Sequence, residues 1–291
     1  MYLKNKTGFF RQISRALAVF VFITAFPAPS SAGNGPDQTI SIASWNIRIF
    51  SDGSRDQTEL TAICSILQMY DFIAVQELRD THVLDRALTV LDLLFDKSYE
   101  YVVSPPLGRG VKERYAFLYD AGRIFWKDVS FGFADPEDRF IREPFGALFQ
   151  AGEFDFYAVT VHSIFGDSKG QRRAEAALLD DVYRAVQDRD SENDVLLFGD
   201  FNLPPDDRGF AELQKLPGIF PLNTTMPTTI HDSLYDNIWM QRHYCGEFTG
   251  EWGVFPFDEL LYGNDDKAAS LAVSDHRPLW ARFDTAGPDD D

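Results

Sequence analysis

The feature that most constrains the fold is a set of short apolar segments, each ending at a polar residue. The clearest is VLLFGDFN, residues 195–202, where an apolar run stops at Gly199 and is followed by Asp200 and Asn202. An apolar run this short, bounded by turn residues, is typical of a buried strand. A strand that ends on a carboxylate and a carboxamide forms either an Asx-type turn or the rim of a polar site.

Segments of the same kind recur along the chain and are separated by turns and by three stretches with helical periodicity. They are numerous enough for two packed sheets covered by helices, so we expect one α/β domain. The predicted helices are residues 57–70, 81–94 and 171–189. The predicted strands are residues 39–47, 71–78, 114–120, 145–150, 154–163, 194–200, 235–241 and 277–283.

The first 32 residues differ in composition from the rest. Four basic residues precede the apolar run 16–26, no acidic residue occurs before Asp37, and the small residues Ser30 and Ala32 follow the run. This is the layout of a secretory signal peptide. We therefore predict export, cleavage near Ala32, and a secreted or periplasmic protein with no membrane anchor after cleavage. The run is shorter than a bilayer span, and an uncleaved anchor is the alternative.

The predicted mature domain spans residues 33–284, and residues 285–291 form an acidic tail that we expect to be disordered. The chain carries 27 basic and 45 acidic residues, and the leader contains four of the basic ones. So acidic a protein does not attract nucleic acid by bulk charge. A polyanionic substrate would need locally placed arginines and metal ions. Cys64 and Cys245 could form a disulfide in an exported protein, but Cys64 also fits a buried helix face.

Polar residues recur at the ends of the predicted strands. Taken singly, each has a structural explanation, such as a turn, a cap or a satisfied histidine. Taken together, two histidines and several carboxylates suit metal-assisted hydrolysis of a phosphate ester. Mg²⁺ prefers carboxylate and carboxamide oxygens, and each histidine needs a carboxylate to orient it. These residues are Asn46, Glu77, His162, Asp200, Asn202, Asp236, Asp275 and His276.

Ten short strings, in this order, resemble the endonuclease/exonuclease/phosphatase superfamily and, within it, the secreted deoxyribonuclease I group most closely. They span residues 40–283. The resemblance implies a four-layer α/β/β/α sandwich, in which two packed, mostly antiparallel or mixed β-sheets are flanked by helices. It also implies a divalent-metal-dependent endonuclease that hydrolyses DNA. The strings are WNIR, VQELRD, YVVSPPLGR, KERYAFLY, REP, VHS, GDFN, YDNI, PFDELLYG and SDHRP.

The resemblance also implies roles for individual residues. His162, paired with Glu113, and His276, paired with Asp236, would be the general acid and general base, in either order. Mg²⁺ or Mn²⁺ would be the cofactor. The implied metal-site residues are Glu77, Asn46, Asp275 and Asp200.

Other residues would meet the substrate. Asp200 and Asn202 resemble a pair that binds a second metal or positions water and phosphate. Arg142 resembles a phosphate contact, and Arg79 resembles a DNA-groove contact. Val111 stands where the secreted animal enzymes carry a groove-contacting tyrosine. Residues 133–140 retain acids that could bind Ca²⁺.

Three alternatives stay open. The same chemistry could act on lipid substrates, as in a sphingomyelinase or a phosphoinositide phosphatase, or belong to a deoxyribonuclease toxin subunit. A catalytically inactive binding protein is disfavoured because both histidines are present. For the leading interpretation we expect a DNA substrate and a monomeric enzyme.

Overall fold

Two six-stranded β-sheets pack face to face in the computed structural model, which describes residues 38–288. In spatial order, the first sheet contains β11 (Phe248–Val254), β12 (Leu279–Asp284), β1 (Thr39–Phe50), β2 (Phe72–Leu78), β4 (Arg114–Asp120) and β3 (Tyr99–Val103). The second contains β5 (Phe125–Gly132), β6 (Phe145–Ala151), β7 (Phe154–His162), β8 (Val195–Asp200), β10 (Asp236–Gln241) and β9 (Ile219–Pro221). Two pairs, β1–β2 and β7–β8, are parallel, and the others are antiparallel.

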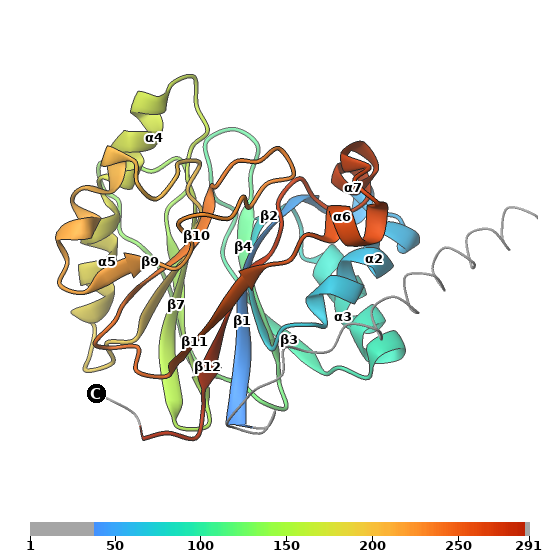
Figure 1. Cartoon of the computed structure of the whole chain (residues 1–291), viewed down its shortest axis with the longest axis horizontal. Coiled ribbons are helices and arrows are strands. Elements are labelled where there is room, and N and C mark those ends of the chain that lie inside the picture. The colour runs from blue at the N-terminus through green and yellow to red at the C-terminus, as the bar shows by residue number, and fades with distance from the viewer. Residues whose placement is uncertain (1–37, 289–291) are drawn as a thin grey trace, which may run out of the picture.

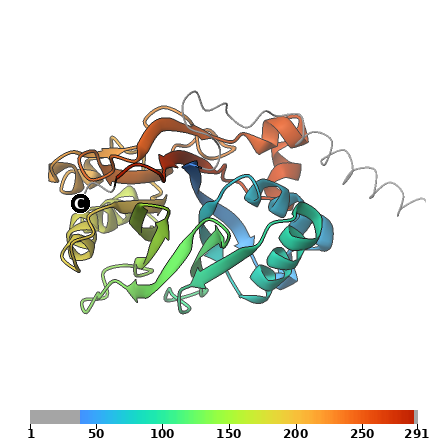
Figure 2. The same ribbon diagram turned by 90° about the horizontal axis from the view of Figure 1, so that it is seen from below.

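Helices cover the outer face of each sheet (Figure 1), and the view from below shows the resulting layers (Figure 2). The four-layer sandwich and its mixed sheets are therefore confirmed. Beside the first sheet lie α2 (Gln57–Leu67), α3 (His82–Phe95), α6 (Phe257–Tyr262), α7 (Asp266–Ala272) and the short helix η2 (Asp52–Ser54). Beside the second lie α4 (Lys169–Ala176), α5 (Leu179–Gln187), η3 (Arg208–Phe210) and η4 (Leu213–Lys215).

The helix predicted at residues 171–189 is wrong, because the structure divides that stretch into α4 and α5. The amide of Leu178 donates to the Glu175 carbonyl at 3.0 Å, which tightens the chain between the two helices. The buried Glu175 carboxylate also accepts hydrogen bonds from the amides of Ile141 and Ile164, both at 2.6 Å. These tertiary contacts fix the end of α4 and carry no periodic signal in the sequence.

Other features at the margins of the domain can be placed. Cys64 is a buried residue of α2 that faces α3, Cys245 lies between the sheets, and the two form no disulfide. Thr285 is held by backbone hydrogen bonds to Gln38 and Glu153. The predicted leader, residues 1–32, and the last part of the predicted tail, residues 289–291, lie outside the described residues. Within residues 38–288, no helix is both long and apolar enough to span a bilayer.

The layer between the sheets is rich in phenylalanine. Phe72 of β2, which is fully buried, has four neighbouring rings whose centroids lie 5.0 to 6.0 Å away. Two of these rings meet Phe72 edge to face, an arrangement that the quadrupoles of aromatic rings favour. The four rings are Phe117, Phe149, Phe156 and Phe198, so this one cluster joins both sheets.

The inward face of each central strand is apolar along its length and becomes polar at one edge of the sandwich. In β8, for example, Leu196 and Phe198 face the other sheet and Asp200 continues the same face. Side chains two apart on a strand share a face, so the period that builds the core also aims the last residue inward. The polar residues that continue these faces are Asn46, Gln76, Glu113, His162, Asp200 and Asp236.

We expect Phe72→Ala to lower the free energy of unfolding by about 3–5 kcal/mol, because it leaves a cavity among four rings that cannot close it. Denaturant unfolding followed by tryptophan fluorescence measures the change. The control is Phe125→Ala, at a side chain that is 62% exposed, which should change stability by less than about 0.5 kcal/mol. Equal effects from the two substitutions would contradict the assigned role of Phe72.

Candidate active site

Three neighbouring strands bring the centre of the candidate site together by their register. His162 of β7 pairs with Asp200 of β8, and Asp200 also pairs with Asp236 of β10. All three residues are buried, at the edge where the sheet interior turns polar. Residues separated by up to 74 positions in sequence thus lie side by side.

Asp200 is the meeting point of the site. Its Oδ2 atom lies 3.6 Å from Nε2 of His162 and 3.6 Å from Nε2 of His276. The same oxygen accepts a hydrogen bond from Nδ2 of Asn46 at 3.1 Å. Side chains from both sheets therefore converge on one carboxylate oxygen.

Each histidine is held from behind by a second carboxylate. Nδ1 of His162 lies 2.9 Å from Oε2 of Glu113, and Nδ1 of His276 lies 2.8 Å from Oδ2 of Asp236. Each pairing leaves Nε2 directed toward Asp200. A carboxylate on Nδ1 fixes the ring orientation and stabilises the cation that forms when Nε2 takes up a proton. The structure thus contains two carboxylate–histidine pairs facing one another, with the partners that the sequence resemblance implies.

Glu113 is surrounded by positive groups. Arg142 contacts it through Nε at 2.7 Å and Nη2 at 2.9 Å, and Arg79 contacts it through Nη2 at 3.1 Å. Burial by itself would raise the pKa of Glu113, but the hydrogen bond from His162 and the two guanidinium groups outweigh it and lower the pKa to about 2. Glu113 is therefore ionised at neutral pH.

In the second pair, the pKa values of both His276 and Asp236 are raised. Burial disfavours the charged form of His276, but the charges of Asp236 and Asp200 and the hydrogen bond from Asp236 outweigh this and raise the pKa of His276 to about 10. Burial raises the pKa of Asp236, and the His276 charge opposes that increase. This histidine is strongly stabilised as a cation by its neighbours.

The opposite side of the site is formed by Asn46 and Glu77. Nδ2 of Asn46 lies 3.3 Å from Oε1 of Glu77, and Oε2 of Glu77 accepts the backbone amide of Ile49 at 3.0 Å. Glu77 and Ile49 both have positive φ angles, 62° and 47°, where the pairing of β1 with β2 shifts its register. Non-glycine residues in this region are strained, and such strain concentrates at functional sites.

Oxygen ligands for a divalent cation are present at this side. Oδ1 of Asn46 is buried and has no hydrogen-bond partner within the described residues, while Glu77 and Asp200 supply carboxylates nearby. Carboxylate and carboxamide oxygens suit Mg²⁺ and Mn²⁺. A second grouping is possible geometrically, since Asp200, Asp236 and His276 each offer an atom within 4.8 Å of the others. In that group, Asp236 is already bonded to His276.

Two predicted site residues are placed differently from the rest. Asp275 is half-buried beside His276, and its backbone carbonyl accepts a hydrogen bond from Ile230 at 3.0 Å. No hydrogen bond or ion pair joins its carboxylate to Glu77 or Asn46 among the described residues. Asn202, with a φ of 52°, directs Nδ2 to the carbonyl of Ser163 at 2.9 Å, so its amide holds the loop after His162.

Several positioning residues carry no distinctive sequence pattern. The Tyr115 hydroxyl accepts the amide of His162 at 2.8 Å, and Ser274 Oγ accepts the amides of Arg48 and His276, each at 3.1 Å. Trp45 Nε1 donates to the carbonyl of His276 at 2.8 Å. Trp45 and Ser274 lie in the strings WNIR and SDHRP, which is the only signal that could have indicated them.

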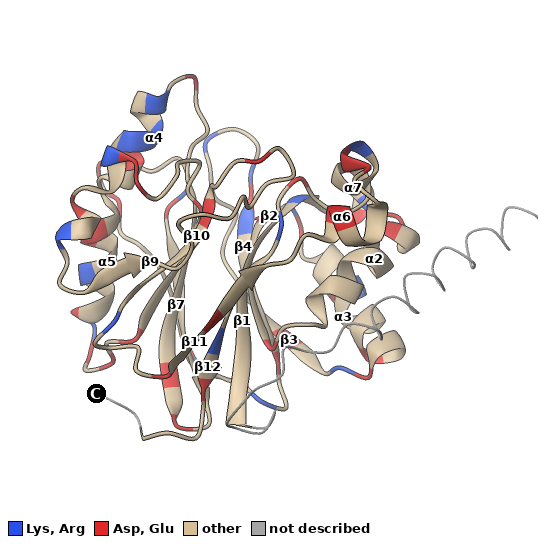
Figure 3. Cartoon of the chain, in the orientation of Figure 1, with Lys and Arg blue, Asp and Glu red and all other residues tan. Residues whose placement is uncertain are grey.

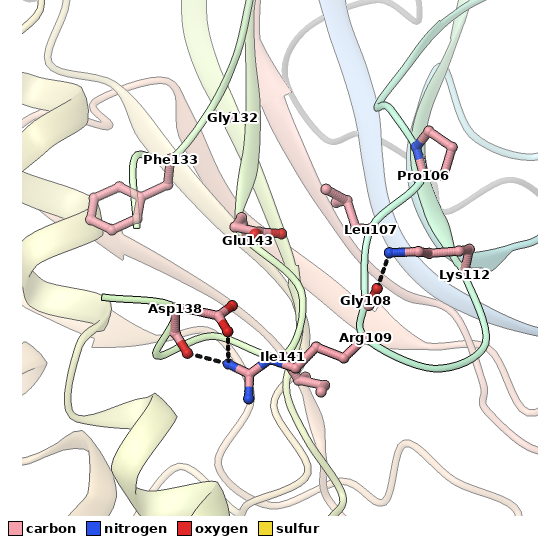
Figure 4. A pocket seen from close by; sticks show the side chains of 10 residues that line it. All are labelled: Pro106, Leu107, Gly108, Arg109, Lys112, Gly132, Phe133, Asp138, Ile141 and Glu143. Atoms are coloured by element: carbon pink, nitrogen blue, oxygen red, sulfur yellow. Dashed lines mark hydrogen bonds and ion pairs between the residues drawn. The ribbon is translucent and has the colours of Figure 1, made fainter. Parts of the chain in front are cut away.

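A hollow of about 410 Å³ lies next to Glu113 and Arg142, between the loop after β3 and the loop after β5 (Figure 4). An ion pair between Arg109 and Asp138 at 3.1 Å joins its two walls. Val111, in the loop after β3, is 73% exposed and makes the tip of that loop apolar. Leu107, which lines the hollow, pairs with Glu113 in an antiparallel bridge, so the hollow adjoins the segment that carries Glu113.

The comparisons with known proteins agree with this geometry. A model of the Endonuclease/Exonuclease/phosphatase family matches residues 43–276. The chain belongs to this family. It is 32% identical over 262 residues to a deoxyribonuclease from Thioalkalivibrio sp. (strain K90mix), covering 84% of this chain and 71% of that protein. It is 31% identical over 265 residues to deoxyribonuclease-1 from Bos taurus, covering 83% and 91%.

Solved structures confirm the fold but span several substrates. A mannosyl-6-phosphatase from Bacteroides thetaiotaomicron superposes with a TM-score of 0.57 at 14% identity, covering 83% of this chain and 98% of that one. The family match and the deoxyribonuclease relatives make this endonuclease/exonuclease/phosphatase family member a hydrolytic enzyme of the nuclease and phosphodiesterase class. The family requires a divalent metal ion, for which the acidic edge supplies ligands.

We expect Glu113→Gln to lower kcat by about 10²- to 10⁴-fold while the protein stays folded, because the amide no longer stabilises a cationic His162. Steady-state hydrolysis of bis(4-nitrophenyl) phosphate measures the change. Glu143→Gln, which lines the nearby hollow, is the control and should keep near-wild-type kcat. A kcat for Glu113→Gln within threefold of the wild type would contradict the role of this pair.

Proposed function

We propose that this protein is an exported, divalent-metal-dependent endonuclease that hydrolyses the phosphodiester bonds of DNA. The observation that carries the proposal is the pair of carboxylate-bound histidines whose Nε2 atoms both lie 3.6 Å from one oxygen of Asp200. Hydrolysis of a phosphodiester requires a proton to leave the attacking water and a proton to reach the departing oxygen. Two opposed histidines can perform the two transfers on either side of one phosphate.

The remaining residues bind and orient the phosphate. Asn46 and Asp200 lie between the histidines and Glu77, where a phosphodiester could rest against both sheets. Arg142 and Arg79, with side chains 16% and 20% exposed, place two positive charges beside His162. Mg²⁺ or Mn²⁺ held by Glu77 and its neighbours would neutralise charge on the phosphoryl oxygens and polarise the phosphorus–oxygen bond.

DNA is the substrate that these features favour. The relatives that cover most of this chain are named deoxyribonucleases. Locally placed arginines offset the strongly acidic composition, because phosphate contacts position a duplex independently of net charge. Arg109, which lines the hollow of Figure 4, and the exposed Val111 of the same loop would add contact surface for a DNA strand.

Export rests on the first 32 residues, whose basic, apolar and small-residue regions match a signal peptide. Cleavage near Ala32 would leave the domain intact, since β1 begins at Thr39. Release from the cell would bring the enzyme to extracellular DNA.

The direct test is nicking of supercoiled plasmid by the mature chain with Mg²⁺ or Mn²⁺, and with EDTA. We expect nicking that needs metal and that falls by at least about 10²-fold in His162→Ala, because one proton transfer is lost. The control is His243→Ala, an exposed histidine just beyond the far end of β10. If the folded wild type nicks DNA with neither metal, the proposal fails, and lipid phosphodiesters and phosphoinositides become the substrates to test.

Metal binding can be measured without turnover. A cation that binds only the folded state raises the free energy of unfolding, by about 2.7 kcal/mol at a hundredfold excess over Kd. The melting temperature rises as a result. We expect saturating Mg²⁺ or Mn²⁺ to raise the melting temperature of the wild type and of Glu153→Gln, an exposed control, but much less that of Glu77→Gln. Equal increases in all three proteins would exclude Glu77 as a ligand.

A further inference from the structure

An exposed aromatic–cation pair stands at the rim of the site, in the segment that follows His162. Phe165 is 58% exposed, and the guanidinium carbon of Arg172 lies 3.8 Å from the centre of its ring. Phe165 lies in the loop between β7 and α4, and Arg172 lies in α4. One face of the ring is covered by the guanidinium group, and much of the rest is open to solvent.

Hydrogen bonds attach this pair to the backbones of the loops that follow β7 and β8. Nε of Arg172 donates to the carbonyl of Phe165 at 2.6 Å, and Nη1 donates to the carbonyl of Asn202 at 3.3 Å. Asn202 follows Asp200 by two residues, and its side chain in turn holds the loop after His162 at Ser163. The pair is therefore fixed relative to the catalytic groups and is not a freely moving surface side chain.

Figure 3 shows α4 as a basic element near the upper edge of the molecule. Arg172 differs from the other basic residues of this helix. Lys169 and Arg173 both bind the buried carboxylate of Asp207, at 3.1 and 2.8 Å. Among residues 38–288, no carboxylate lies within 4.0 Å of the Arg172 guanidinium, and its Nη2 makes no hydrogen bond. Two N–H groups and a full positive charge thus remain available beside the catalytic edge.

The placement of Phe165 also lacks a packing explanation. It belongs to none of the three apolar cores, although the neighbouring strand β7 contributes six residues to them. Exposing an aromatic ring gives up the stabilisation that burial provides. A ring held rigidly at a catalytic rim, with a cation behind it, provides a surface on which a nucleobase can stack.

We propose that Phe165 and Arg172 form a subsite for the nucleotide next to the scissile phosphate. Arg172 binds the adjoining backbone phosphate through Nη2, and the free face of Phe165 stacks on an unpaired base. This deepens the proposed DNA hydrolysis and rests on it. Because bases inside a duplex already stack on each other, the subsite contributes more to the binding of single-stranded DNA than to the binding of the same sequence in a fully paired duplex.

Binding is measured by fluorescence anisotropy of a labelled 12-nucleotide strand, alone and annealed to its complement. The proteins carry His162→Ala to prevent cleavage, and Mg²⁺ is present throughout. We expect Phe165→Ala to raise Kd for the single strand by about 5- to 100-fold, with a smaller effect on the duplex, and Phe165→Trp to keep tight binding. Phe125→Ala, another exposed phenylalanine on the outer strand β5, should bind like its parent.

Arg172 has a separate readout. Loss of one phosphate contact lowers the slope of log K against log salt by about 0.7 for a single strand, so Arg172→Ala should show that decrease. Arg184→Ala, another exposed arginine, is the control and should keep the slope. An unchanged single-strand Kd for Phe165→Ala together with an unchanged slope for Arg172→Ala overturns the subsite. Plasmid nicking by the wild type tests the proposed function separately, so failure of one is not read as failure of the other.

Discussion

The packing of two sheets through a layer of phenylalanine rings is the interaction on which the rest of the structure depends. The cluster around Phe72 locks strands of both sheets at a fixed distance and rotation. Close packing leaves such a layer little freedom to shift, so the ends of its strands are also held in precise positions. That precision is what allows Asn46 of one sheet and Asp200 of the other to meet at 3.1 Å.

The polar edge carries charges that would be unstable if isolated. Asp200 and Asp236 are buried, and burying an unpaired carboxylate costs several kcal/mol. Asp200 lies beside nitrogen atoms of His162 and Asn46, and Asp236 is bonded to His276. Each carboxylate is therefore paired with nitrogen donors. A network of this kind stabilises little by itself, but it fixes the side-chain geometry that catalysis needs. The strained backbone at Glu77 is tolerated because the sandwich around it is rigid.

Much of the site could be predicted because its residues occur at the ends of strands with recognisable patterns. Period-two alternation indicated β1, and a short apolar run bounded by turn residues indicated β8. The strings KERYAFLY and YDNI gave the pairing of His162 with Glu113 and of His276 with Asp236 through the family resemblance. Other features could not be predicted. The break between α4 and α5 depends on Glu175, whose partners Ile141 and Ile164 come from two other loops. The orientation of the buried Asn202 amide likewise depends on the Ser163 carbonyl.

By itself the sequence determined the inventory: which residues are inside, which strands end in polar groups, and which chemistry those groups can perform. It could do so because side-chain direction on a strand alternates strictly, so a local pattern identifies a face. Only the tertiary structure decided which polar ends meet, which arginine is neutralised and which stays available, as Arg173 and Arg172 show. Those outcomes depend on distances between segments far apart in the chain, and such distances are set by packing and not by any local pattern.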